Sequence, residues 1–153
     1  MREFDYYIFI DYSENLIGYS IIEKTKLKEV LPKILRFRHY RAAKDKKLYL
    51  KNVKKAIERD NIKSSFLKLK IKEIHKNIEV YLDVLEFLKK YENCIIFISV
   101  DNSQYLAFRK IVNIVDGKNI VVKKESELLQ GTPEYLASLI LDNLLNIERL
   151  KRK

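Results

Sequence analysis

Residues 94–98 read CIIFI, an uninterrupted apolar run that leads into the acid Asp101. A strand with one face open to water carries polar side chains at every second position. A run without them therefore indicates a strand covered on both faces. We expect an α/β domain in which helices pack on the sheet that contains this strand.

A second apolar strand also ends on an acid. Residues 4–11 finish at Asp11, and the short turn YSEN connects them to an antiparallel strand over residues 16–23, since Ser and Asn favour turns. An ionised carboxylate at the end of a buried strand loses hydration, so it must be paired, hydrogen-bonded or bound to a metal ion. The structural alternative is that Asp11 accepts hydrogen bonds from backbone N–H groups of residues 13–15 (SEN).

Between the strand over residues 16–23 and the strand over residues 94–98, the patterns predict one further strand and two helices. Residues 26–37 (KLKEVLPKILRF) alternate at Leu27, Glu29 and Leu31 and read as a third strand, with Pro32 at an edge or an end. A basic helix is predicted over about residues 48–59. A long helix is predicted over about residues 65–91, because apolar residues step by three and four at Ile71, Ile74, Ile78, Leu82, Leu85 and Leu88.

After the apolar run, the sequence predicts a helix over about residues 103–115, a short buried strand over residues 119–124 and a final helix. Thr132 can cap the final helix, with Pro133 at its first helical position. The apolar side of that helix is predicted at Leu136, Ile140, Leu144 and Ile147. The predicted order is three strands, two helices and then β-α-β-α.

Length and composition predict one domain, residues 1–153, with a basic helical segment at about residues 36–91. The single cysteine, Cys94, cannot form an internal disulfide, which favours a reducing cytoplasm. The N-terminus lacks the apolar segment of a signal peptide, and no run approaches the roughly 18 residues needed to cross a membrane. The richness in Lys, Ile and Glu and the lack of Trp resemble the composition of thermophile proteins.

The net charge of +10 comes from an excess of basic residues in the middle of the chain. In residues 36–44 (RFRHYRAAK) the basic side chains alternate with Phe37 and Tyr40, a combination suited to phosphate contact and base stacking. The predicted nucleic-acid-binding residues are Arg36, Arg38, His39, Arg41, Lys44, Lys47, Lys51, Lys54 and Lys55. The alternative is a packed segment whose charges only face water, as on a lysine-rich thermophile surface.

Three stretches carry a family resemblance. FIDYSENLIGYSIIE is an Asp-ended strand, a turn and a Gly-Tyr-containing strand; IIFISVDNSQYLAFRKIV is a strand that ends in an acid and leads into a helix; PEYLASLI places an acid before a Leu-Ala-rich segment. Together with the element order they resemble the ribonuclease H-like superfamily, and within it RuvC-type Holliday-junction resolvases and related nucleases. The resemblance implies a mixed five-stranded sheet, three antiparallel strands followed by β-α-β-α, flanked by helices.

Carried onto this chain, the resemblance implies that Asp11, Asp101 and Glu134 are catalytic and hold Mg²⁺ or Mn²⁺, whose hard oxygen ligands are carboxylates. Such proteins usually have four acids, and Glu125 or Glu127 could supply the fourth. Asp142 lies eight residues after Glu134, about 12 Å along a helix, too far for both to bind one metal cluster. We therefore prefer Glu134. The structural alternatives are a helix cap for Asp101 and a favourable helix dipole for Glu134.

The leading hypothesis is a divalent-metal-dependent nuclease that acts on structured DNA or RNA. The alternatives are a non-catalytic nucleic-acid-binding or scaffold protein with a degenerate site, and a structural protein whose basic surface serves solubility. A homodimer is possible, because resolvase-like members of the fold often pair. The sequence has no nucleophile elbow, Gly-rich phosphate loop, GxGxxG or zinc signature, which argues against the common hydrolases, kinases and dinucleotide-binding proteins.

Overall fold

A computed structural model describes residues 3–99, 102–115 and 119–152, and its centre is a five-stranded sheet. The strands are β1 (Tyr6–Ser13), β2 (Leu16–Glu23), β3 (Lys68–Glu73), β4 (Cys94–Ile98) and β5 (Ile120–Lys124). Their order is β3-β2-β1-β4-β5. The first three are antiparallel neighbours, whereas β4 runs parallel to both β1 and β5. The predicted mixed sheet is confirmed.

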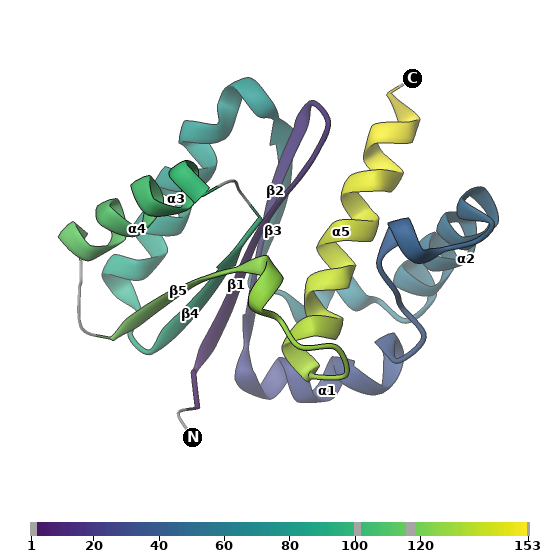
Figure 1. The fold of residues 1–153 in the computed structure, drawn as a ribbon. Coiled ribbons are helices and arrows are strands. Elements are labelled where there is room, and N and C mark those ends of the chain that lie inside the picture. The colour runs from purple at the N-terminus through teal and green to yellow at the C-terminus, as the bar shows by residue number, and fades with distance from the viewer. Residues whose placement is uncertain (1–2, 100–101, 116–118, 153) are drawn as a thin grey trace.

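Helices cover both faces of this sheet (Figure 1). The α-helices are α1 (Lys24–Ile34), α2 (Lys46–Arg59), α3 (Asn77–Lys90), α4 (Asn102–Val115) and α5 (Pro133–Lys151). Short 3₁₀ turns are η1 (Tyr40–Ala42), η2 (Ile62–Ser65), η3 (Ile74–Lys76) and η4 (Glu125–Glu127). Helices α3 and α4 lie on one face. Helix α5 lies on the other, with α1 and α2 packed beside it, so the molecule has three layers.

Successive side chains of β1 lie on opposite faces of the sheet, which explains why both faces are apolar and which face Asp11 occupies. Ile8 and Ile10 belong to the core under α3 and α4, whereas Tyr7 and Phe9 contact the core under α5. Successive side chains of a strand point to opposite faces. Asp11 therefore follows Tyr7 and Phe9 onto the face that α5 covers.

The predicted third strand over residues 26–37 is wrong, because this segment forms α1. Leu27, Val30 and Ile34 are its buried residues, and their spacing of three and four is the helical period. Pro32 lies in the last turns of the helix. The third strand of the sheet is instead β3, so α1 and α2 are inserted between the second and third antiparallel strands.

The predicted long helix over residues 65–91 is also wrong in its first part. Residues 68–73 form β3, where Leu69 and Ile71 alternate with exposed lysines at the edge of the sheet. Helix α3 begins only at Asn77, and Ile78 and Leu82, placed on the buried stripe by the sequence, are exposed. The basic segment is accordingly helical only in part. Of the apolar residues that predicted this helix only Ile71 lies in β3, and a segment this short does not separate the strand period from the helix period.

The other elements follow the sequence closely. Helix α2 covers the predicted basic helix, β4 and β5 are strands as expected, and α5 begins at Pro133 with Thr132 accepting from the Tyr135 N–H. Buried Cys94 is a core residue. In the part of the chain that the structure describes, no helix is both long and apolar enough to cross a membrane.

Candidate functional site

A cavity of about 370 Å³ opens where the ends of β1 and β4 meet α5. Its wall combines carboxylates with basic and polar side chains. We call it the acidic cavity, and its lining residues are Asp11, Tyr12, Ser13, Glu14, His39, Tyr40, Arg41, Ser99, Glu125, Asp142, Asn146 and Arg149. Residues from five separate stretches of the chain therefore converge on one space.

The parallel pairing of β1 with β4 positions Asp11. Ile10 pairs with Ile98, and the Ser99 N–H donates to the Ile10 carbonyl at 2.9 Å, so Asp11 lies just beyond the paired region. Its Oδ1 accepts the Tyr12 N–H at 2.8 Å, and it is also hydrogen-bonded to the Ser99 side chain. Only 8% of Asp11 is exposed. The hydrogen bonds of the Asp11 carboxylate thus come from Tyr12, within β1, and from Ser99, just after β4.

A glycine lets α5 approach the sheet at the level of Asp11. Gly18 is the partner of Asp11 across β1 and β2. A Cβ added at Gly18 would lie 2.9 Å from Leu141 Cδ1 and 3.2 Å from Leu145 Cδ2, closer than side chains pack. The absence of a side chain at Gly18 therefore allows the middle of α5, where Asp142 lies, to come next to Asp11.

Burial dominates the electrostatics of the two aspartates. It raises the pKa of Asp11 well above its usual value, and the nearby carboxylates of Glu125 and Asp142 raise it further. Burial also raises the pKa of Asp142, although the Tyr40 N–H, His39 and Arg41 counteract it. Burial thus disfavours the ionised form of both carboxyl groups. A proton or a bound cation would stabilise them, so the site favours either one.

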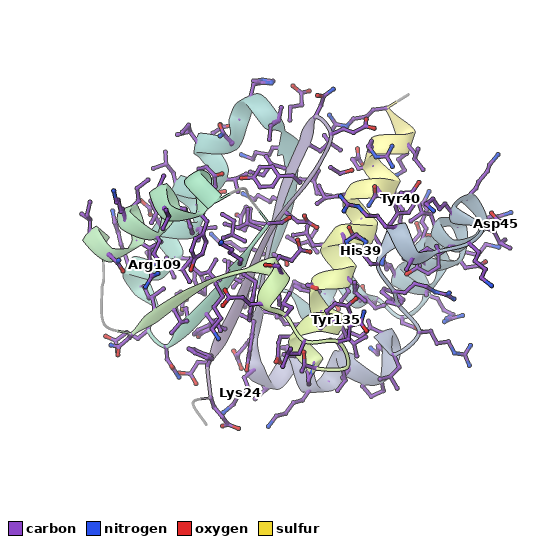
Figure 2. The ribbon with its side chains drawn as sticks, viewed as in Figure 1. Lys24, His39, Tyr40, Asp45, Arg109 and Tyr135 are labelled. Atoms are coloured by element: carbon purple, nitrogen blue, oxygen red, sulfur yellow. The ribbon has the colours of Figure 1, made fainter. Side chains whose placement is uncertain are left out.

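His39 and Tyr40 lie beside α5 (Figure 2), and polar side chains of that helix hold residues 38–41 against the acidic cavity. Asp142 Oδ2 accepts the Tyr40 N–H at 2.9 Å, and its Oδ1 lies 3.4 Å from His39 Nε2. The Asn143 amide donates to the Arg38 carbonyl and to the Tyr49 hydroxyl, each at 3.2 Å. Residues 38–41 are therefore fixed beside Asp11 and Asp142, and this places His39 and Arg41 in the wall of the acidic cavity.

The structure brings together only part of the predicted acid set. Glu125, the first residue of η4, lines the cavity with Asp11. Glu134 is half-buried near Tyr7. Burial raises the pKa of Tyr7, and the Glu134 carboxylate raises it further. Tyr7 precedes Asp11 by four residues of β1, about 13 Å along the strand. Asp101 lies outside the described residues.

Asp142, rather than Glu134, lines the acidic cavity together with Asp11 and Glu125. Glu134 and Asp142 are eight residues apart in α5, about 12 Å along the helix, so one cation cannot bind both. The metal role of Glu134 stays a prediction, and Glu134 is not part of the lining of the acidic cavity. A signal for the other choice was present in the sequence: Ser138, Asp142 and Asn146 follow one another every four residues in α5 and make a polar line on an otherwise apolar helix. All three are buried.

The predicted basic residues form two groups in the structure. His39 and Arg41 line the acidic cavity. The remaining residues are exposed, on the segment before η1 or on α2 and the residues just before it: Arg36, Arg38, Lys44, Lys47, Lys51, Lys54 and Lys55. Arg38 lies over the Tyr49 ring, 5.4 Å from its centroid. Of the two aromatic residues predicted to stack on bases, Phe37 is buried in the core under α5, so it cannot stack, and Tyr40 is half-buried.

The donor chemistry of the cavity suits a hard divalent cation, because Asp11, Glu125 and Asp142 offer carboxylate oxygens. Within residues 3–99, 102–115 and 119–152, however, no three His, Cys, Asp or Glu side chains are close enough together to hold one metal ion. Asp11, Glu125 and Asp142 therefore share one cavity without forming a metal site among the described residues. His75, in η3, is exposed, and its Nδ1 lies 3.4 Å from Glu73 Oε2.

No protein-family model matches the chain, and no curated protein matches it. The fold is similar to that of a chain in the structure of the PCNA:RNase HII complex from Archaeoglobus fulgidus. The identity is 14%, the match covers 96% of this chain and 75% of that chain, and the TM-score is 0.50. Ribonuclease H2 from Pyrococcus horikoshii OT3 matches with 13% identity, 97% and 76% coverage and a TM-score of 0.49.

Identities this low bear on the fold alone. The strand order, the antiparallel and parallel pairings and the helices on both faces agree with that similarity. The chain therefore has an α/β fold of the ribonuclease H-like type.

Proposed function

We propose that this protein is a divalent-metal-dependent nuclease that hydrolyses phosphodiester bonds of structured DNA or RNA at the acidic cavity. The observation that carries the proposal is the convergence of buried Asp11 and Asp142 from a strand end and a helix, with raised pKa values, on a cavity that also has basic side chains. Buried carboxylates with perturbed pKa values in a cavity are typical of functional sites.

Asp11 and Asp142 would be the principal metal ligands. Glu125 is a further oxygen donor on the same wall, and Asp101 is the proposed ligand that completes the set. A bound Mg²⁺ or Mn²⁺ would supply an activated water and stabilise the developing charge of the leaving oxygen. The protein's own part is to keep both carboxylates oriented. Backbone N–H groups of Tyr12 and Tyr40 do this, because each donates to one of them at 2.8 and 2.9 Å.

The basic segment would bind the substrate. His39 and Arg41 are placed at the rim of the acidic cavity, and the exposed lysines of α2 continue the positive surface away from it. Cations of this kind contact phosphates and give affinity without reading sequence. The structural neighbours named as RNase HII support a nucleic-acid substrate. Whether the protein acts as a homodimer stays a prediction.

Titration with Mn²⁺, followed by thermal unfolding and by cleavage of labelled duplex, junction and RNA oligonucleotides, tests the proposal. Mn²⁺ should raise the unfolding temperature of the wild type, because a ligand that binds only the folded state stabilises it. Asp11→Asn and Asp142→Asn should abolish that rise and reduce cleavage at least about 100-fold.

Glu134→Gln is the matched control, since it removes a half-buried carboxylate from the same helix as Asp142. It should keep both the Mn²⁺ response and the cleavage within about threefold of the wild type. Loss of activity in Glu134→Gln with full activity in Asp142→Asn would assign the site to the first turn of α5. A wild type that neither responds to Mn²⁺ nor cleaves any substrate would remove the nuclease proposal.

A second candidate function is nucleic-acid binding without cleavage. It is favoured by the lack of a three-ligand metal group among the described residues. Oligonucleotide binding that weakens steeply with salt, in a protein that never cleaves and does not respond to Mn²⁺, would establish this alternative.

A further inference from the structure

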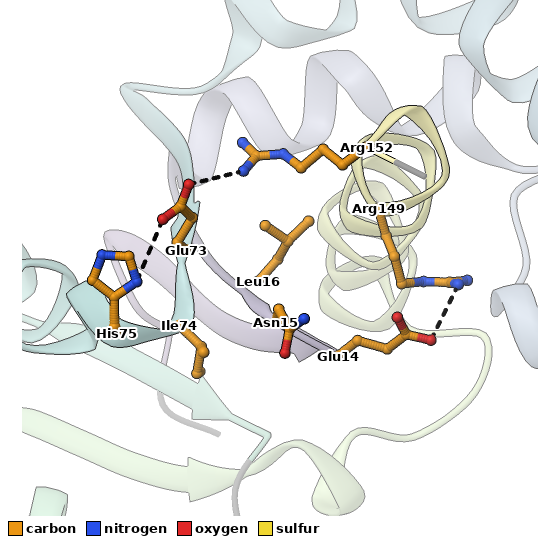
Figure 3. A pocket seen from close by; sticks show the side chains of 8 residues that line it. All are labelled: Glu14, Asn15, Leu16, Glu73, Ile74, His75, Arg149 and Arg152. Atoms are coloured by element: carbon orange, nitrogen blue, oxygen red, sulfur yellow. Dashed lines mark hydrogen bonds and ion pairs between the residues drawn. The ribbon is translucent and has the colours of Figure 1, made fainter.

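Arg149 lies between the acidic cavity and a second cavity of about 480 Å³. We call the second one the turn cavity; its walls are residues 14–16 of the β1–β2 turn, residues 73–75, Arg149 and Arg152 (Figure 3). Glu14 and Arg149 belong to the linings of both cavities. The two spaces are therefore neighbours separated by one ion pair.

The guanidinium of Arg149 is fixed in place. Its Nε donates to Ser13 Oγ at 3.1 Å and its Nη2 to Asn146 Oδ1 at 3.0 Å, while Nη1 lies 3.4 Å from Glu14 Oε1. The Tyr40 ring lies against it, 5.6 Å from the guanidinium carbon. Only 13% of the side chain is exposed, compared with 44% for Arg152. A cation held this firmly loses little entropy when it binds an anion.

Arg149 also keeps hydrogen-bonding capacity. A guanidinium has five N–H groups, two of them on each terminal nitrogen. In the described part of the chain, each terminal nitrogen donates one bond, so one N–H on Nη1 and one on Nη2 remain for an outside acceptor. Two N–H groups from one planar fork match two oxygens of a phosphate.

The partner of Arg149 in the structure is easily displaced. The Glu14 carboxylate is 56% exposed and its ion pair with Arg149 is long. Exposed pairs of this kind are worth about 0–1 kcal/mol. A phosphate that binds with two hydrogen bonds could therefore replace Glu14 without a large cost.

We propose that Arg149 binds a backbone phosphate next to the one that is cleaved, and that the substrate strand continues past it into the turn cavity. The proposal rests on the nuclease function proposed for the acidic cavity. It assigns the turn cavity as a second nucleotide subsite. The strand would enter along the basic segment, cross the acids and leave over the last turns of α5.

Arg152 is the second cation on this path. It follows Arg149 by three residues, a rise of about 4.5 Å along α5, and so lies on the same side of the helix. Its guanidinium is 3.5 Å from Glu73, which also lies 3.4 Å from His75 (Figure 3). Glu73 is exposed, and Arg152 also pairs with the partly exposed Glu148, 3.4 Å from its Nε. Arg152 can therefore exchange Glu73 for the next phosphate in the way described for Arg149.

Fluorescence anisotropy of labelled single-stranded oligonucleotides, in EDTA so that no cleavage occurs, tests this path. Arg149→Gln should weaken binding of a dinucleotide and a dodecanucleotide about tenfold or more, since a charged hydrogen bond is worth about 1.5–3 kcal/mol. Arg152→Gln should weaken only the dodecanucleotide, about three- to fivefold. Arg109→Gln removes the same charge from α4 on the opposite face (Figure 2) and should stay within twofold.

The dependence on salt separates phosphate binding from a structural role. Arg149→Gln should reduce the slope of log affinity against log salt by about 1, whereas Arg149→Lys should keep the slope because it keeps the charge. Glu14→Gln should tighten binding, because it removes the carboxylate that competes with the phosphate. An Arg149→Gln variant that is folded and binds like Arg109→Gln overturns the proposal, as does a Glu14→Gln variant that binds more weakly.

Cleavage by the same preparations keeps the two proposals distinguishable. Wild-type cleavage with no effect of Arg149→Gln on affinity or salt slope would refute the subsite alone. Binding that depends on Arg149 in a protein that never cleaves would refute the nuclease function. It would leave Arg149 as a phosphate-binding residue.

Discussion

The two faces of the sheet are built for different tasks. Under α3 and α4 the core is almost wholly apolar, with Ile8, Ile10 and Ile96 packed against Val84 and Phe87. The buried polar and charged side chains among the described residues lie on the face that α5 covers: Asp11, Ser20, Ser138, Asp142, Asn143 and Asn146. Both faces therefore contribute an apolar core, and only the face under α5 also holds buried polar groups in fixed positions.

The largest effect on stability is expected on the apolar face. Phe87→Ala should lower the free energy of unfolding by about 3–5 kcal/mol, because it removes a buried ring that packs on Tyr6 and Tyr91. Urea unfolding measures the loss. Oligonucleotide affinity of the folded fraction should not change. An affinity loss equal to that of Arg149→Gln would break the division between the faces.

A smaller effect is expected on the α5 face, but it should reach function. Asn143→Ala removes an amide that donates to Arg38, Tyr49 and the Leu139 carbonyl, and it should cost about 1–3 kcal/mol of stability. The segment that carries His39 and Arg41 should loosen, so oligonucleotide binding should weaken as well. Stability measured by urea and affinity by anisotropy should fall together. A stability loss with unchanged affinity would show that the segment needs no support from α5.

The close approach of α5 to β2 offers a third test. Gly18→Ala places a methyl group against Leu141 and Leu145, and it should cost about 1 kcal/mol because only flexible side-chain ends have to move. The more informative result is the Mn²⁺ response, which should weaken as Asp142 moves away from Asp11. Calorimetric unfolding with and without Mn²⁺ measures both effects. An unchanged response would mean that the packing at Gly18 does not set the distance between the acids.

The smallest effect at any one pH comes from protonation. Burial raises the pKa of Asp11 and of Asp142 in the folded protein. Folding is then favoured by their protonated forms, so this contribution to stability is complete below the ordinary aspartate pKa of about 3.9. It is lost as the pH rises through the folded-state values. Without metal, Asp11→Asn should gain stability relative to the wild type between about pH 5 and pH 8. The difference in urea midpoints should grow with pH, and a constant difference would contradict the raised pKa.

The sequence predicted the parts of the fold that depend on local pattern. The apolar run of β4, the hairpin of β1 and β2, the capped start of α5 and the basic helix α2 all follow from residues that are neighbours in the chain. The errors fall where two periods fit the same residues. Residues 26–37 alternate well enough for a strand but bury a helical face, and residues 68–73 fit a helix but form an edge strand.

The candidate site divides in the same way. Asp11 could be found from sequence, because an acid at the end of an apolar strand is costly wherever the strand lies. Asp142 could not be chosen over Glu134 by spacing alone, since the choice depends on which turn of α5 comes level with the end of β1. Contact of Gly18 with Leu141 and Leu145 decides this, and it joins residues more than 120 positions apart. Packing between distant segments, which local sequence does not encode, therefore brings Asp142 rather than Glu134 to the cavity that Asp11 lines.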